Sequence, residues 1–182
     1  MITKVQTSIE DLYRTEESAE IVNGEIIKMS PTGAMPSFAA SEIFVSLRGY
    51  SRRTKSGWAV GDNTGFRVKL ADRESFSPDA SYYVGQHPGM KFYEGAPIFA
   101  VEVRSENDYG DDAEEKTRKK KQDYFLAGTK VFWDVDLIGI DTIKVYRDSD
   151  PDNPTIYRRG EIAEAEPVLP SWIFPVNDLF FA

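Results

Sequence analysis

Hydrophobic and polar positions recur along this chain with the periods of short strands and helices. Two apolar runs flank Asn23-Gly24 within residues 20–29, a pattern typical of a β-hairpin. Strands are predicted over residues 57–70 and 78–84, and over the nearly continuously apolar residues 97–103, which favour a strand covered on both faces. The later strands are predicted over 130–135, 141–147 and 155–159.

Three helices are predicted among these strands. Thr7-Ser8-Ile9-Glu10 has the form of a capping box and predicts a short helix to about residue 14. Pro36 suits the first turn of a second helix that runs to about residue 53. A third helix covers about 111–127 and ends at Gly128. The closing segment is expected to pack back on the body, so the order predicts one α/β domain over 1–182, with a mixed central β-sheet flanked by helices and an N-terminal helix and β-hairpin.

The net charge of the chain argues against some classes of function. The 182 residues contain 22 Lys+Arg and 30 Asp+Glu, for a formal charge of −8. This balance argues against a protein that coats nucleic acid through bulk charge. A negative net charge is still compatible with a local basic surface. The chain has two positive clusters, one formed by Arg52, Arg53 and Lys55 and the other by residues 116–121.

The reactive side chains are few. The chain has no cysteine and one histidine, His87, which excludes disulfides, thiolate catalysis and metal sites built from cysteines or several histidines. His87 lies between glycines in a predicted loop, so the chemistry must come mainly from carboxylates, lysines and arginines. No apolar segment is long enough for a membrane span, the first residues lack the apolar core of a signal peptide, and we expect a cytoplasmic protein.

Two carboxylates on predicted strands are candidates for a site. Glu102 interrupts an apolar strand, where an unpaired buried carboxylate is costly. It must be exposed, neutralised, bound to a metal, or paired with a cation, of which Arg104 on the same strand face is one. Asp79 follows Pro78 at the start of another strand, and the alternative for it is a turn-forming aspartate.

A lysine and a further glutamate complete the candidates. Lys120 lies one helical turn before Tyr124, which fixes the buried face of the third helix, so Lys120 should point toward the sheet whereas Lys119 points away. Glu20 begins the hairpin, where a solvent-facing charge is the alternative. Carboxylate oxygens bind Mg²⁺, which activates water at a phosphodiester, and a nearby lysine can orient or deprotonate that water.

Five segments in order resemble a bacterial family described as "putative restriction endonucleases", within the PD-(D/E)XK nuclease superfamily. They are residues 20–31, Ser77-Pro78-Asp79-Ala80, Ala100-Val101-Glu102-Val103-Arg104-Ser105, residues 120–136 and Pro167-Val168-Leu169-Pro170. The resemblance implies a restriction-endonuclease-like core, DNA as substrate and Mg²⁺, or Mn²⁺ in its place, bound by Asp79 and Glu102. By analogy with nucleases that pair to cut two strands, we expect a homodimer.

The resemblance also assigns roles near the metal. Glu20 is implied as an auxiliary acidic residue. The superfamily's catalytic lysine usually lies two positions after the strand glutamate, where this chain has Arg104, which can stabilise phosphate charge but is a poor base. Lys120 is similar to a lysine that has moved to the following helix.

Three functions are therefore open. The first is a Mg²⁺-dependent DNA endonuclease. The second is a binding or structural protein that keeps the fold without turnover, which Arg104 and the absence of a histidine near Pro36 favour. The third is a metal-dependent phosphoesterase that acts on another substrate.

Overall fold

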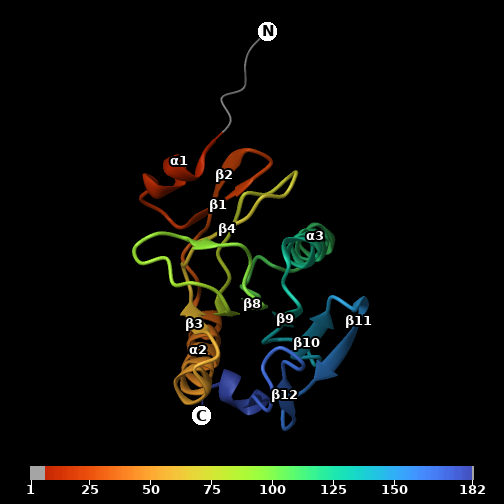
Figure 1. Cartoon of the computed structure of the whole chain (residues 1–182). Helices are drawn as coiled ribbons and strands as arrows, with labels where there is room; N and C mark the ends of the chain where they lie inside the picture. Colours follow the sequence, from red (N-terminus) through yellow and green to blue (C-terminus); the bar gives the residue numbers. More distant parts are fainter. Residues whose placement is uncertain (1–6, 182) are drawn as a thin grey trace.

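The body of the protein is a six-stranded sheet with helices on both faces (Figure 1). A computed structural model describes residues 7–181. The strand order is β11-β10-β9-β8-β6-β3, antiparallel except for the parallel pair β8 and β9. The bounds are β3 (Trp58–Gly61), β6 (Ala80–Tyr83), β8 (Phe99–Val103), β9 (Val131–Val135), β10 (Ile143–Arg147) and β11 (Asp150–Tyr157). The predicted α/β fold with a mixed central sheet is confirmed.

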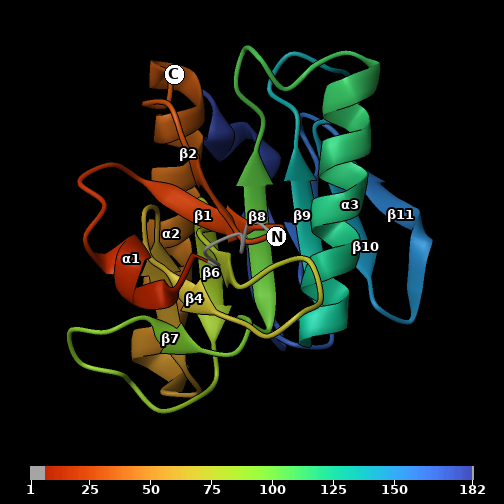
Figure 2. The same cartoon turned by 90° about the horizontal axis from the view of Figure 1, so that it is seen from above.

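Strand alternation divides the core between the two faces. Helix α2 (Ala34–Thr54) lies on one face and α3 (Asp111–Ala127) on the other (Figures 1 and 2). Val101 and its same-face neighbours pack in the cluster that includes Ile43 of α2, whereas Ala100 packs with Tyr124 of α3. Since side chains alternate along a strand, Glu102 shares the α3 face with Ala100.

Smaller sheets lie beside α3. The predicted hairpin is formed by β1 (Ala19–Val22) and β2 (Glu25–Lys28). Asn23 and Gly24 have φ of 52° and 72°, the left-handed pair that a two-residue hairpin turn requires. A three-stranded sheet contains β4 (Phe66–Arg67), β5 (Ser75–Phe76) and β7 (Tyr93–Glu94). The Ile21 amide donates to Ser75 Oγ at 2.8 Å, which ties the hairpin to β5.

Helix termini differ slightly from the predictions. Helix α1 (Ile9–Tyr13) has its capping box on Ser8 and Asp11, so the predicted box on Thr7 and Glu10 is wrong by one residue. Asp11 replaces the usual longer side chain and accepts the Ser8 amide at 2.9 Å. Helix α2 begins at Ala34 rather than Pro36, which places the proline in the first turn, where its missing N–H costs no helical hydrogen bond. Gly128, with φ of 112°, ends α3 as predicted.

The closing segment packs back on the sheet. It contains β12 (Ile162–Glu164), β13 (Ile173–Pro175) and a 3₁₀ helix (Val176–Leu179). Trp172 and Phe174 are buried against Trp133 of β9, which confirms the prediction. Strand β11 begins five residues earlier than predicted. Its two prolines weaken the sequence pattern of a strand, but β11 is an edge strand, where prolines are tolerated. Within residues 7–181, no helix is long and apolar enough to cross a bilayer.

Candidate functional site

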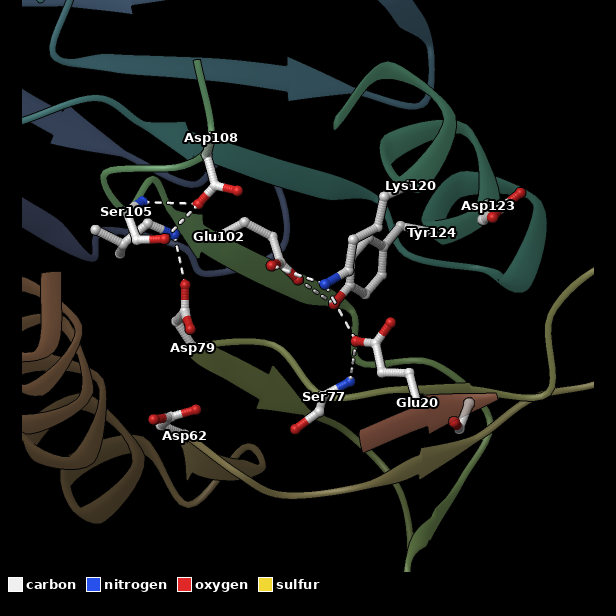
Figure 3. Close-up of polar contacts among 12 residues, drawn as sticks. Glu20, Asp62, Ser77, Asp79, Glu102, Ser105, Asp108, Lys120, Asp123 and Tyr124 are labelled. Atoms are coloured by element: carbon white, nitrogen blue, oxygen red, sulfur yellow. Dashed lines mark hydrogen bonds and ion pairs between the residues drawn. The ribbon is translucent and has the colours of Figure 1, made fainter. Parts of the chain in front are cut away.

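Asp79 and Glu102 come together across neighbouring strands. The Asp79 amide donates to the Val101 carbonyl at 3.1 Å, just before β6 begins. Asp79 Oδ2 accepts the Val103 amide at 2.6 Å. Its other oxygen has no hydrogen-bond donor among the described residues. The Glu102 side chain projects from β8 toward α3 (Figure 3). The pairing of β6 with β8 therefore places both carboxylates at one pocket.

Lys120 points from α3 into this site and contacts two carboxylates (Figure 3). Its Nζ lies 2.9 Å from Glu102 Oε2 and 3.1 Å from Glu20 Oε1. The lysine side chain is 20% exposed and that of Glu20 is 7% exposed. The inward direction predicted for Lys120 is confirmed, and the alternative of a solvent-facing Glu20 is wrong because β5 and α3 cover the hairpin entry.

Glu20 belongs to a chain of alternating charges that starts and ends on helix α3. Its Oε1 also accepts the Ser77 amide at 2.8 Å, and its Oε2 accepts Arg73 Nη1 at 2.6 Å. Arg73 Nε donates to Asp123 Oδ2 at 2.9 Å. Asp123 lies three residues after Lys120 on α3, so the chain of ion pairs returns to the helix where it began.

Arg73, Asp123 and Tyr124 are site residues that the sequence did not reveal. Arg73 precedes β5 in a turn and carries no motif. The sequence pattern places Tyr124 on the buried face of α3 but gives it no role in the site. Its hydroxyl donates to Glu102 Oε1 at 2.7 Å, and its ring stacks on Phe76 with centroids 4.0 Å apart. The spacing of Lys120, Asp123 and Tyr124 on one helix face is a signal that could have found two of them.

Burial and charge perturb the acids of the site. Burial, with the neighbouring Glu102 charge, raises the pKa of Asp79 to about 8. Burial also raises the pKa of Glu102, and Lys120 offsets this only in part. Burial alone would raise the pKa of Glu20, but Lys120 and Arg73 outweigh it and lower that pKa. The site therefore holds Glu20 ionised and disfavours ionisation of Asp79.

Arg104 lies on the same face but outside this group. Its guanidinium makes two 2.7 Å contacts with Asp134 of β9 and also binds Glu114 of α3. The alternative that Arg104 neutralises Glu102 is wrong, because Lys120 does so. Helix α3 runs antiparallel to β8, so Arg104 meets the first turns of the helix, whereas Glu102 meets the later ones. Arg104 thus fastens the start of α3 to the sheet.

An open pocket of about 720 Å³ gives access to the carboxylates. Its lining includes Ser77, Asp79 and Glu102, with Asp62 and Asn63 after β3 and residues 28–32 after β2. Among residues 7–181, no three His, Cys, Asp or Glu side chains are arranged to hold a metal ion. Any metal here would take two protein carboxylates and complete its shell with water or substrate oxygens.

Comparisons with known proteins bear on the fold and the family of this chain. A crystal structure of a "putative nuclease belonging to DUF820" from Anabaena variabilis aligns with a TM-score of 0.74 and 17% identity, over 95% of this chain and 97% of that one. At this identity the match shows the fold. A search of the curated proteins finds no match. The family model described as "Putative restriction endonuclease" matches residues 7–177, and the chain therefore belongs to this family, Uma2.

Proposed function

We propose that this protein is a Mg²⁺-dependent DNA endonuclease that hydrolyses phosphodiester bonds. The observation that carries the proposal is the position of Lys120 between Glu102 and Glu20, next to an open pocket that Asp79 and Glu102 line. This arrangement needs neither cysteine nor histidine, which suits a chain with no cysteine and one histidine.

The donor set fits a hard divalent cation. Asp79 and Glu102 would hold the ion, since carboxylate oxygens are the ligands that Mg²⁺ and Mn²⁺ prefer. With Asp79 ionised, the acids around Arg73 and Lys120 outnumber these two cations, and a divalent ion would offset part of the excess negative charge. When bound, Mg²⁺ supplies neutralisation of phosphate charge and a lowered pKa for water.

Lys120 orients the attacking water and stabilises charge on the phosphate. A lysine ammonium has three donors, and Glu102 and Glu20 take two of them. The third donor would serve a water or phosphate oxygen that comes next to Glu102 from the pocket. In the reaction the water oxygen forms a bond to phosphorus and gives up its proton to solvent, while the bond to the leaving nucleotide oxygen breaks and that oxygen takes a proton from solvent. Two adjacent carboxylates favour the charged ammonium, so Lys120 suits orientation better than proton removal.

Arg73, Asp123 and Arg104 act as positioning residues. Arg73 fixes Glu20, and Asp123 fixes Arg73, so the Lys120 ammonium keeps its place. Arg104 holds the first turns of α3 through Glu114 and Asp134. We assign none of the three to contact with substrate.

A plasmid cleavage assay tests the proposal. Supercoiled DNA is incubated with the wild-type protein in Mg²⁺, Mn²⁺ or EDTA, and with the variants Asp79→Ala and Glu102→Ala. The matched control is Asp141→Ala, which removes a carboxylate from the exposed Arg158 pair. We expect cleavage with metal, none in EDTA, and loss in the two site variants only. No cleavage with either metal, or cleavage that survives in both site variants, would overturn the proposal.

A further inference from the structure

A second pocket lies at the other end of β3 from the carboxylates. It has a volume of about 580 Å³ and lies between the last turns of α2 and the start of β3, which pack together (Figure 1). Its lining contains three cations, the exposed ring of Trp58 and no acidic residue: Arg48, Ser51, Arg52, Lys55, Ser56, Gly57, Trp58, Val84 and Gly85. We call it the α2 groove.

The cations of the α2 groove have no acidic partners. The side chains of Arg48, Arg52 and Lys55 are exposed and make no ion pair or hydrogen bond within the part of the chain that the structure describes. Apart from Arg53 and Arg159, which lie over aromatic rings, the other arginines are all paired with acids. These are Arg14, Arg67, Arg73, Arg104, Arg118, Arg147 and Arg158. Among the arginines, those without an acid or an aromatic ring as partner thus gather at one place on a chain of net charge −8.

Helix stability explains only part of this cluster. Basic residues in a last helical turn interact favourably with the helix dipole, which covers Arg52 and Arg53 of α2. Arg48 lies before the last turn, so the helix dipole does not account for it. Lys55 caps the helix with a left-handed φ of 53°, a conformation that glycine adopts at lower cost. The position thus keeps a cation where helix termination alone would favour glycine.

Strand β3 joins the α2 groove to the catalytic pocket. Trp58, its first residue, lines the groove, and Asp62, just after its last, lines the pocket that holds Asp79. Four residues of strand span about 13 Å, and four steps of a DNA strand span about 14 Å. β3 is also the edge strand of the sheet. One DNA molecule can therefore reach both places.

We propose that the α2 groove binds the DNA phosphate backbone a few nucleotides from the cleaved bond. Arginine guanidinium groups match phosphate oxygens in pairs, and Lys55 adds a third charge. Trp58 donates its indole N–H to the Gly85 carbonyl at 3.2 Å and meets the His87 ring edge-on at 4.8 Å between centroids, and the residue is 42% exposed, which leaves ring surface for stacking against a base. The role in cleavage rests on the proposed function, whereas DNA binding itself does not.

Binding measured without metal tests this groove. Fluorescence anisotropy follows a labelled 20-base-pair duplex and its single strand in EDTA, for wild type and the double variant Arg48→Gln/Arg52→Gln. The control, Lys130→Gln/Arg158→Gln, removes the same charge from exposed ion pairs elsewhere. We expect the groove variant to bind at least about 10-fold more weakly, with the slope of log K against log salt reduced by about 2. Unchanged affinity and slope, or an equal loss in the control, overturns the proposal.

Tryptophan fluorescence gives a second readout. Trp133 and Trp172 are buried, so quenching on addition of DNA should come from Trp58 and disappear in Trp58→Phe. Quenching that persists in that variant, or competition by polyglutamate as strong as that by DNA of equal charge, counts against a nucleic-acid site. DNA that binds through the groove without being cut would overturn the proposed function alone.

Discussion

Replacing Asp79 with Asn should stabilise the metal-free protein although it removes a proposed metal ligand. Asn keeps an acceptor for the Val103 amide and removes the buried charge. Because burial and Glu102 raise the pKa of Asp79 from 3.8 to about 8, the folded state holds a proton there that the unfolded chain releases. Between these two pH values the folded state binds more protons, so this group's contribution to stability falls as pH rises.

The size of the stabilisation by Asp79→Asn follows from the raised pKa of Asp79. Each unit between pH 3.8 and about 8 corresponds to about 1.4 kcal/mol of unfolding free energy, which sets an upper bound of ~6 kcal/mol over this range. Asp79 is partly exposed, and access of water reduces this figure. We expect Asp79→Asn to raise the free energy of unfolding by about 2–3 kcal/mol at pH 8 and by little at pH 4.

Urea unfolding in EDTA at pH 4, 6 and 8 measures the gain directly. The control is Asp62→Asn, which removes a carboxylate from the lining of the same pocket. A gain for Asp79→Asn that does not grow with pH, or a loss of stability, would refute the assignment of Asp79 as a disfavoured buried charge. A gain of equal size in the control would show that the net charge of the pocket is responsible.

Three further predictions follow from the packing and the charge network, and a fourth from the analogy with nucleases that pair to cut two strands. Lys120→Gln should abolish cleavage, as gel assays would show, because it removes the cation between two carboxylates; residual cleavage above one-tenth of wild type would contradict its role. Arg104→Met should lower the free energy of unfolding by about 3–5 kcal/mol, measured in urea, because it leaves a buried acid on β9 unpaired. Gly57→Ala should lower the melting temperature, because the added Cβ would lie 2.5 Å from the Tyr83 carbonyl. Gly49→Ala has open space around it and should raise the free energy of unfolding by up to about 1 kcal/mol. Similar changes in melting temperature for both variants would contradict this reasoning. Sedimentation equilibrium should show a homodimer, and a monomer throughout would reject that prediction.

The local patterns predicted the fold well because each has a direct physical cause. Asn23-Gly24 permits the left-handed turn of the hairpin, and Gly128 ends α3 for the same reason. The short strands β5 and β7 are absent from the predictions because two residues carry no periodicity, whereas β4 lies within the predicted strand region 57–70. Their pairing depends on contacts between distant segments, such as that between Ile21 and Ser75.

The candidate site was predictable where a residue conflicted with its surroundings. Glu102 in an apolar strand and Lys120 on a buried helix face both required a partner, and each is the other's partner. Arg73 was not predictable, because its partners lie 53 and 50 residues away in sequence and nothing near it is unusual. The sequence indicated which charges needed neutralisation, and the tertiary structure determined the pairs.

The most direct test of the central claim is a crystal structure of the protein with Mn²⁺, with the ion located by anomalous scattering. The account predicts an ion held by the carboxylates of Asp79 and Glu102, with the Lys120 ammonium beside it. Saturating Mn²⁺ that leaves this pair without an ion, or that binds only elsewhere, would contradict the assignment of these residues as a metal-dependent nuclease centre.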